Sequence, residues 1–152
     1  QYGLGLSVMW KNFDVNVFFN GSAKRRIMLM DGSEKIYPFV QTSGHARLNL
    51  MQWIADSHWV EGADNSNVAY PRMGVSQAEI ANNIQPSTWW MRKADFIRFK
   101  TLEIGYRFPF CRVYFSGDNL AVWSPFKLWD PELDYNSYPL SRTFNIGVQV
   151  SF

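Results

Sequence analysis

The residues best suited to catalysis or metal binding are scattered along the chain and form no familiar constellation. His45 and His58 are 13 positions apart, and neither has a cysteine or a third ligand at a metal-binding spacing. Asp56, Ser57 and His58 supply the residue types of a catalytic triad, but adjacent residues on one short helix cannot converge on one reacting atom. The pattern favours polar loop histidines and predicts no enzymatic activity.

A second group of possible metal ligands lies near the C-terminal end. Asp130, Glu132 and Asp134 offer hard carboxylate oxygens that suit Ca²⁺, but a solvated loop turn is the favoured interpretation. Cys111 is the single cysteine of the chain, which excludes an intrachain disulfide and a multi-cysteine zinc site. It is interpreted as a spectator thiol, so we expect neither a metal nor a cofactor.

Tryptophans in the inserts between strands point to binding rather than to bond chemistry. A large, rigid apolar face can stack on a sugar or fill a pocket of a protein partner. The alternative is that these rings pack the loops against each other. The candidates for ligand or partner contact are Trp53, Trp59, Trp89, Trp90, Trp123 and Trp129.

The composition is unusual for a soluble domain of 152 residues. Aromatic residues make up 17% of the chain and charged residues only 18%, whereas soluble domains carry about 25% charged residues. The net charge of +2 is too small to indicate a nucleic-acid partner. No apolar run approaches the ~20 residues of a membrane helix. The chain starts at Gln1 without a signal peptide, so it is expected to be a mature chain or a piece of one.

Alternation of apolar and polar residues predicts five β-strands. The expected strands cover residues 2–10, 13–20, 94–108, 113–122 and 143–152, with a tight turn at Lys11–Asn12 and a short turn over residues 109–112. A phase change within the third strand predicts either a bulge near Lys100–Thr101 or a strand end that leaves the layer. A long insert over residues 21–93 is expected to contain a helix from His45 to Val60, and a second insert covers residues 124–141.

Two short helices are therefore expected in the long insert. The first has its apolar stripe on Leu48, Met51, Ala55 and Trp59. The second begins at a capping box formed by Ser76 and Glu79.

Alternation by itself fits either a soluble sandwich or a membrane barrel. Strand lengths of about 9–11 residues suit a tilted strand that crosses a bilayer. Short and long connections alternate, as periplasmic turns and external loops do in outer-membrane barrels. Because five strands cannot close a barrel, we expect a fragment of a larger one. Aromatic residues also gather at the strand ends, as in an interfacial girdle: Trp10, Phe13, Phe108, Phe110 and Phe152.

Several stretches resemble the SusC/RagA-type TonB-dependent outer-membrane transporters. Residues 89–106 (WWMRKADFIRFKTLEIGY), 112–120 (RVYFSGDNL) and 129–132 (WDPE) are similar to motifs of this family, with Asp118 where the family usually has Gln. Tyr138–Pro139, residues 142–144 and the terminal Phe152 resemble its closing motif. Good matching covers residues 89–152, and looser matching covers the rest.

The resemblance implies that residues 1–152 are the C-terminal segment of the transporter, forming the last five antiparallel strands of a 22-stranded outer-membrane barrel. The two inserts are then long extracellular loops with short helices, and the plug domain lies outside this chain. The family imports oligosaccharides, glycans or peptides across the cell outer membrane. It does so together with a SusD-like surface lipoprotein, with energy from TonB, which contacts the absent N-terminal part.

The barrel interpretation assigns the two faces of the strands. The C-terminal Phe152 is expected to be the signal for the barrel-assembly machinery. The lumen-facing residues are predicted to include Asn16, Glu103, Arg107, Asn145 and Gln149. The lipid-facing residues are predicted to include Leu4, Leu6, Val15, Val17, Ile104, Val148 and Val150. The rival hypothesis is a soluble β-sandwich that binds carbohydrate through its loop tryptophans.

Overall fold

The computed structural model describes all residues except 30–51, 75–76, 84, 134–136 and 151–152. The chain divides into two compact units. The first consists of Gln1–Ile27 and Arg92–Phe152, and the second of Met28–Met91. Each unit is described by itself below.

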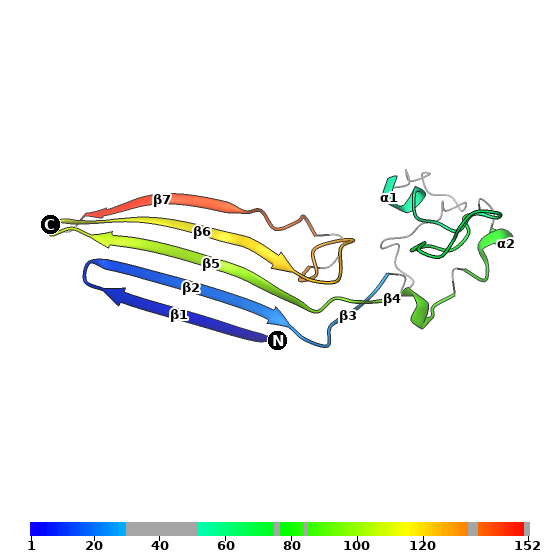
Figure 1. The fold of residues 1–152 in the computed structure, drawn as a ribbon, viewed down its shortest axis with the longest axis horizontal. Helices are drawn as coiled ribbons and strands as arrows, with labels where there is room; N and C mark the ends of the chain where they lie inside the picture. The colour runs from blue at the N-terminus through cyan, green and yellow to red at the C-terminus, as the bar shows by residue number, and fades with distance from the viewer. Residues whose placement is uncertain (30–51, 75–76, 84, 134–136, 151–152) are drawn as a thin grey trace. The chain divides into compact units, whose positions relative to one another are not determined.

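The first unit is a five-stranded antiparallel sheet with the order β1-β2-β5-β6-β7 (Figure 1). Each strand of this sheet pairs with the strand that follows it in the sheet order, and β3 and β4 lie between β2 and β5 in the sequence, so the sheet is a meander with one long insert. The predicted strands are confirmed, with small shifts at their ends. The strands are β1 (Tyr2–Trp10), β2 (Phe13–Ser22), β5 (Phe96–Arg107), β6 (Cys111–Trp123) and β7 (Thr143–Val150).

Tight turns join the strands at one end of the sheet. The predicted turn at Lys11–Asn12 is confirmed, and Lys11 adopts a left-handed conformation with φ of 53°. The turn between β5 and β6 is shorter than predicted, because the backbone N–H of Phe108 donates to the carbonyl of Cys111 at 2.7 Å. Arg112 therefore belongs to β6 and not to the turn.

Aromatic side chains line the turn end of the sheet. Phe13 and Phe108 both contact Tyr106 edge-on, with ring centroids 4.8 and 4.7 Å apart. Trp10 and Phe110 are two-thirds exposed. Such a row of exposed aromatic rings is typical of the interfacial girdle of a membrane barrel.

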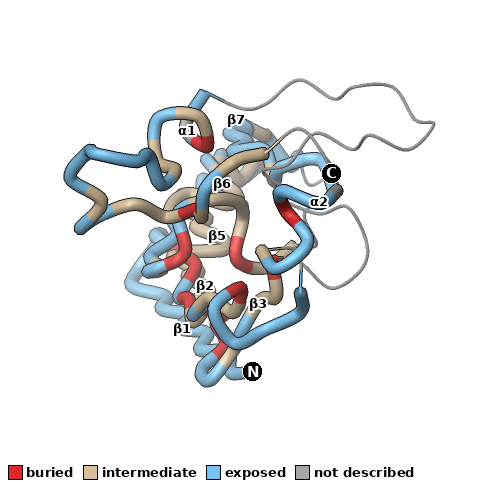
Figure 2. The backbone as a smooth tube through the Cα atoms, turned by 90° about the vertical axis from the view of Figure 1, so that its right-hand side faces the viewer, coloured by how far each residue is buried: buried red, intermediate tan, exposed pale blue. Residues whose placement is uncertain are grey.

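One face of the sheet is apolar and open. Val15 lies opposite Val8 on β1 and Ile104 on β5, and the same row continues through Phe115 to Ile146. Ile146 is 80% exposed, and all residues of β1 are exposed, as the pale blue colour at its label in Figure 2 indicates. The register puts all the predicted lipid-facing residues on this face: Leu4, Leu6, Val15, Val17, Ile104, Val148 and Val150.

A bulge at Lys100 reverses the alternation within β5. Thr101 pairs with Phe18, but the next pair is Phe99 with Phe19, so one residue of β5 is left without a partner. The predicted bulge near Lys100–Thr101 is thereby confirmed. It keeps Phe99 on the apolar face, where its ring stacks on Phe19 with centroids 4.7 Å apart, and it turns Arg98 to the polar face.

The second unit contains short helices packed around a small core. Its elements are α1 (Gln52–Ala55), α2 (Gln77–Ile80) and the 3₁₀ helix η1 (Thr88–Trp90). The strands β3 (Arg26–Met28) and β4 (Met91–Lys93), where the chain passes between the two units, form a separate two-stranded sheet. Among the described residues of the unit, the buried apolar side chains are Leu29, Ile54, Tyr70, Ile80 and Trp90. Across residues 1–29, 52–74, 77–83, 85–133 and 137–150, no helix combines the length and apolar character needed to span a membrane.

The predicted helix from His45 to Val60 is wrong at its C-terminal end. Helix α1 ends at Ala55, and the backbone N–H of Trp59 donates to the carbonyl of Tyr70 at 3.0 Å. This pairing with a distant segment, together with a bridge between His58 and Tyr70, replaces the last helical turn. His45, Leu48 and Met51 lie outside the described residues, as does Ser76 of the predicted capping box, whereas the short helix expected there is confirmed as α2.

Candidate functional site

The five residues predicted to line a lumen lie on one polar face of the sheet. Asn16 is opposite Glu103, and Ser116 continues this row from Glu103 to Asn145. Two rows nearer the turns on the same face, Arg112 lies between Arg107 on β5 and Gln149 on β7. Since antiparallel partners point to the same side, the alternation of the sequence brought these side chains together as expected.

An ionic network occupies the turn end of this polar face, with Arg112 at its centre. The guanidinium of Arg112 donates to both carboxylate oxygens of Asp14, with Nε at 3.1 Å from Oδ1, and its Nη2 also donates to Glu103 at 2.6 Å. Arg107 pairs with the same Asp14 at 3.4 Å, and Arg112 Nη1 lies 3.4 Å from Gln149 Oε1. Paired guanidinium and carboxylate groups of this kind are fixed in orientation and strongly bound.

Two members of this network were missed in the sequence. Asp14 is two positions before Asn16 on β2, so the alternation that assigns Asn16 to the polar face also assigns Asp14 to it. Arg112 was assigned to a turn, so its place in β6 was not foreseen. The network lines a hollow of about 370 Å³ on the polar face, whose wall also includes Ser7 and Asn16.

A second ionic cluster joins the last insert to the opposite end of the sheet. Arg98 is only 3% exposed, and its Nη2 donates to both oxygens of Asp130 at 2.5 and 2.7 Å. Its Nε lies 2.7 Å from Glu132 Oε2, and Asn20 donates to Glu132 Oε1 at 3.0 Å. The favoured prediction of a solvated turn is therefore wrong, because these carboxylates compensate a buried cation.

The calcium alternative gains no support from the described part of the insert. Asp130 and Glu132 are engaged by Arg98, and Asp134 lies outside the described residues. Nowhere in the described ranges do three histidine, cysteine or acidic side chains gather to hold a metal ion.

The tryptophans of the inserts have different environments. Trp90 is 2% exposed and contacts Trp89 edge-on with centroids 4.8 Å apart, whereas Trp89 is 45% exposed. Trp59 is also exposed, and Trp129 is half-buried in the last insert. Trp123 proves to be the final residue of β6, not a loop residue. Trp53 belongs to α1, and its side chain lies outside the described part.

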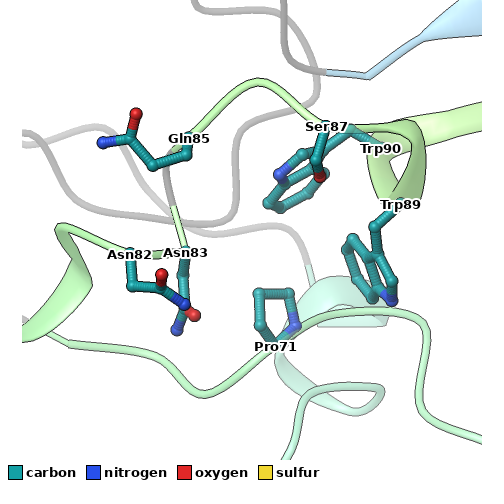
Figure 3. Close-up of a pocket in the computed structure, with 7 residues that line it drawn as sticks. All are labelled: Pro71, Asn82, Asn83, Gln85, Ser87, Trp89 and Trp90. Carbon is teal, nitrogen blue, oxygen red and sulfur yellow. The ribbon is translucent and has the colours of Figure 1, made fainter.

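Trp89 and Trp90 border a hollow of about 380 Å³ within the second unit. Figure 3 shows the two indole rings and the Pro71 ring on one side and the carboxamides of Asn82 and Asn83 on the other. The described lining is completed by Gln85 and Ser87. It combines apolar rings with neutral hydrogen-bonding groups, a combination typical of ligand pockets.

The remaining candidates for chemistry are engaged in local structure. His58 Nδ1 lies 2.6 Å from the carbonyl of Ala55, and the hydroxyl of Ser57 accepts a hydrogen bond from the backbone N–H of Ala69. Cys111 is half-buried at the start of β6. Outside the sheet, the backbone N–H of Ser66 donates to Asp64 and lowers the pKa of that carboxyl.

Comparison with known proteins gives relatives over nearly the whole chain, although no family model matches. The TonB-dependent receptor P3 of Formosa agariphila is 26% identical over 99% of this chain and 16% of its own length. The TonB-dependent receptor P26 of the same organism is 24% identical over 99% of this chain and 17% of its own length. The chain thus spans about one sixth of the length of the curated relatives that it matches.

Solved structures agree with these relatives. A chain of the RagAB peptide transporter is 25% identical, with a TM-score of 0.67 over 99% of this chain and 17% of that chain. The RagAB peptide importer in its closed-closed state has the same fold, with a TM-score of 0.67 at 23% identity and the same coverage. These similarities confirm the predicted resemblance to SusC/RagA-type TonB-dependent transporters of the outer membrane. They favour an all-β fold similar to one part of the RagAB transporter chain.

The Arg112 network can be tested at Gly105, which lies beneath it. A Cβ atom at Gly105 would lie 2.5 Å from Arg112 Nη2 and 2.7 Å from Asp14 Oδ2. Gly105→Ala is therefore expected to destabilise the folded full-length protein by about 1–3 kcal/mol, the usual cost of overpacking, in urea titrations of the purified protein.

The matched control is Gly5→Ala on β1, where the nearest side-chain atom would be 3.6 Å from the new Cβ. This variant is expected to change the free energy of unfolding by less than about 1 kcal/mol. Equal stabilities of the two variants would contradict a tightly packed network.

Proposed function

We propose that this chain is the C-terminal wall segment of an outer-membrane TonB-dependent importer for oligosaccharides, glycans or peptides. The observation that carries the proposal is the two-sided sheet, which exposes an apolar face and holds a charged network on the other. In a barrel the apolar face meets lipid and the polar face lines the lumen. The similarity to the RagAB peptide transporter and to TonB-dependent receptors supports this assignment.

The edges of the sheet also support a role as one part of a larger barrel. Among the described residues, β1 pairs only with β2, and β7 pairs only with β6. An unpaired strand edge is not tolerated inside a bilayer, because its backbone groups would lack hydrogen bonds. The remaining strands of the same transporter would complete both edges, and its plug and TonB-contacting segment would lie outside this chain.

On this proposal, Asn16, Glu103, Arg107, Asn145 and Gln149 belong to the wall of the substrate path. The side chains of Arg107 and Gln149 are more than a third exposed, so they are available to a passing polar molecule. The wall positions the substrate by hydrogen bonds and performs no bond chemistry. A SusD-like lipoprotein at the cell surface is the proposed partner. The chain is similar to a chain of the RagAB peptide transporter, and SusC/RagA-type transporters work together with such a lipoprotein.

The soluble β-sandwich is not favoured. A sandwich buries its apolar face against a second sheet. In the described part of the chain, the sheet formed by β3 and β4 is the single other sheet, and its strands have three residues each. It is too small to cover the apolar face of five strands.

A lysine placed on each face tests the membrane assignment. Val17 is near the middle of β2 on the apolar face. Val17→Lys in the full-length protein is expected to destabilise the membrane-inserted barrel by about 2–4 kcal/mol, because the ammonium group would face hydrocarbon. The measurement is the amount of folded protein in the outer membrane, followed by urea unfolding in lipid vesicles.

The neighbouring variant Asn16→Lys adds the same charge to the polar face and should assemble almost normally. A full-length protein that is released from cells without detergent, or that tolerates both lysines equally, would count against the membrane assignment.

The pocket of the second unit is the proposed contact of the importer with its substrate or lipoprotein partner. Trp89 offers a half-exposed ring, and Asn83 and Gln85 keep their amide oxygens as acceptors while their NH₂ groups donate to the carbonyls of Arg72 and Ala81. Hydroxyl and amide N–H groups are the donors that such oxygens accept. Trp59 and Trp129 are weaker candidates, since neither lines this hollow.

Trp89→Ala is expected to weaken substrate binding or lipoprotein capture by about tenfold or more, because an anchoring aromatic ring is lost. Binding is measured on the purified full-length protein with neutral trisaccharides and tripeptides, and capture by co-purification of the lipoprotein. Asn67→Ala, an exposed asparagine of the same unit outside the pocket, is the control. Unchanged binding and capture in Trp89→Ala would remove the pocket from the proposal.

Phe152 is proposed as the signal for barrel assembly. It lies outside the described residues, and the proposal rests on its position two residues beyond the end of β7. Deletion of Phe152 is expected to reduce the outer-membrane level of the full-length protein several-fold, whereas Phe152→Tyr keeps an aromatic terminus and should restore it. Immunoblots of outer-membrane fractions measure both variants, and a normal level after deletion would argue against a targeting role.

A further inference from the structure

Arg98 is a buried cation that joins two segments far apart in the sequence. It lies on β5, and its two carboxylate partners lie 32 and 34 positions later in the insert between β6 and β7. Figure 1 shows this insert beside the ends of β5 and β6. The side chain of Arg98 is 3% exposed, whereas those of Asp130 and Glu132 are 11% and 28% exposed.

The acidic partners are held in a defined turn. The backbone N–H of Leu133 donates to the carbonyl of Asp130 at 3.3 Å, and the N–H of Glu132 donates to Asp130 Oδ1 at 2.9 Å. Pro131 occupies the second position of this turn, where its fixed φ is favourable. The turn therefore presents both carboxylates to Arg98 with little freedom of its own.

The bulge at Lys100 makes this contact possible. By simple alternation Arg98 would share the face of Leu102 and Ile104, and its charge would point away from the polar face. The extra residue in β5 reverses the phase, so that Arg98 lies opposite Asn20 on the polar side. Asn20 then completes the cluster through its hydrogen bond to Glu132.

A buried guanidinium keeps its position only when carboxylates compensate it, and removal of one partner leaves an uncompensated charge. Asp130 and Glu132 supply these carboxylates to Arg98, and both belong to one short segment of the insert. A second contact, from Asn119 Nδ2 to the carbonyl of Ser141 at 3.0 Å, holds the far end of the same insert. Arg98 on β5 and Asn20 on β2 thus both hold the Asp130–Leu133 turn to the sheet.

We infer that Arg98 is a positioning residue that clamps the Asp130–Leu133 turn at the polar face, so that this turn forms a fixed part of the substrate path. The inference rests on the proposed function in taking the polar face as the wall of that path. The clamp makes this turn part of the wall at the ends of the strands.

The test measures the rate of trypsin cleavage after Lys127 and compares the unaltered full-length protein with its variants, each assembled in outer-membrane vesicles. Lys127 is an exposed residue of the insert, so cleavage there reports local release of the segment. Arg98→Gln is expected to accelerate this cleavage at least about tenfold, because two carboxylates lose their cation. The barrel itself should remain folded, as judged by its heat-modifiable mobility in gels.

Two further variants separate charge compensation from packing. Arg142→Gln removes an exposed arginine at the end of the same insert and should leave cleavage after Lys127 unchanged. The neutral triple variant, Arg98→Gln with Asp130→Asn and Glu132→Gln, removes the ion pairs without leaving an uncompensated charge, and cleavage after Lys127 should stay accelerated because the clamp is absent. Should Arg98→Gln prevent assembly, Glu132→Gln is measured in its place and should give a smaller acceleration.

Unchanged protection in an assembled Arg98→Gln protein would overturn the clamp. Recovered protection in the triple variant would overturn it equally, because uncompensated carboxylates, and not the loss of the clamp, would then explain the release. Both outcomes leave the proposed importer intact. Failure of the unaltered full-length protein to enter the outer membrane would instead overturn the proposed function before the clamp is measured.

Discussion

Antiparallel pairing with a period of two residues is the constraint on which the first unit depends. Each of the four pairings holds the apolar rows of neighbouring strands in line, from Val8 through Val15 and Ile104 to Phe115 and Ile146. A slip of one residue in any strand would exchange its two faces. The charges on that strand would then face the apolar environment, and its valines and leucines would enter the polar network. The same register that arranges the apolar face therefore assembles the Arg112 network.

Charge compensation at both ends of the polar face follows from this register. Near the turns, Arg112 shares Asp14 with Arg107 and also reaches Glu103. At the other end, the bulge at Lys100 brings Arg98 to the same face and so to the acidic turn of the last insert. One local irregularity in the ladder thus connects the sheet to a loop, which is a common use of β-bulges next to functional regions.

Much of the sheet could be predicted, because strand alternation is a local property. The five strands, the turn at Lys11–Asn12 and the bulge near Lys100 were all visible in the order of residue types. The helix expected to reach Val60 was less predictable, since the segment after Ala55 pairs with Tyr70 instead of continuing the helix. Short helices owe most of their stability to packing, so their ends depend on distant contacts.

The sequence by itself determined the two-faced strands, the polar identity of Asn16, Glu103, Arg107, Asn145 and Gln149, and the resemblance to a transporter family. Only the tertiary structure decided which charges meet. Asp14 and Arg112 are 98 positions apart, and Arg98 and Asp130 are 32 apart. Alternation assigns a side chain to a face, but an ion pair also requires a particular register and loop path. Register and loop path arise when all strands and inserts pack together, and no single stretch of sequence contains them.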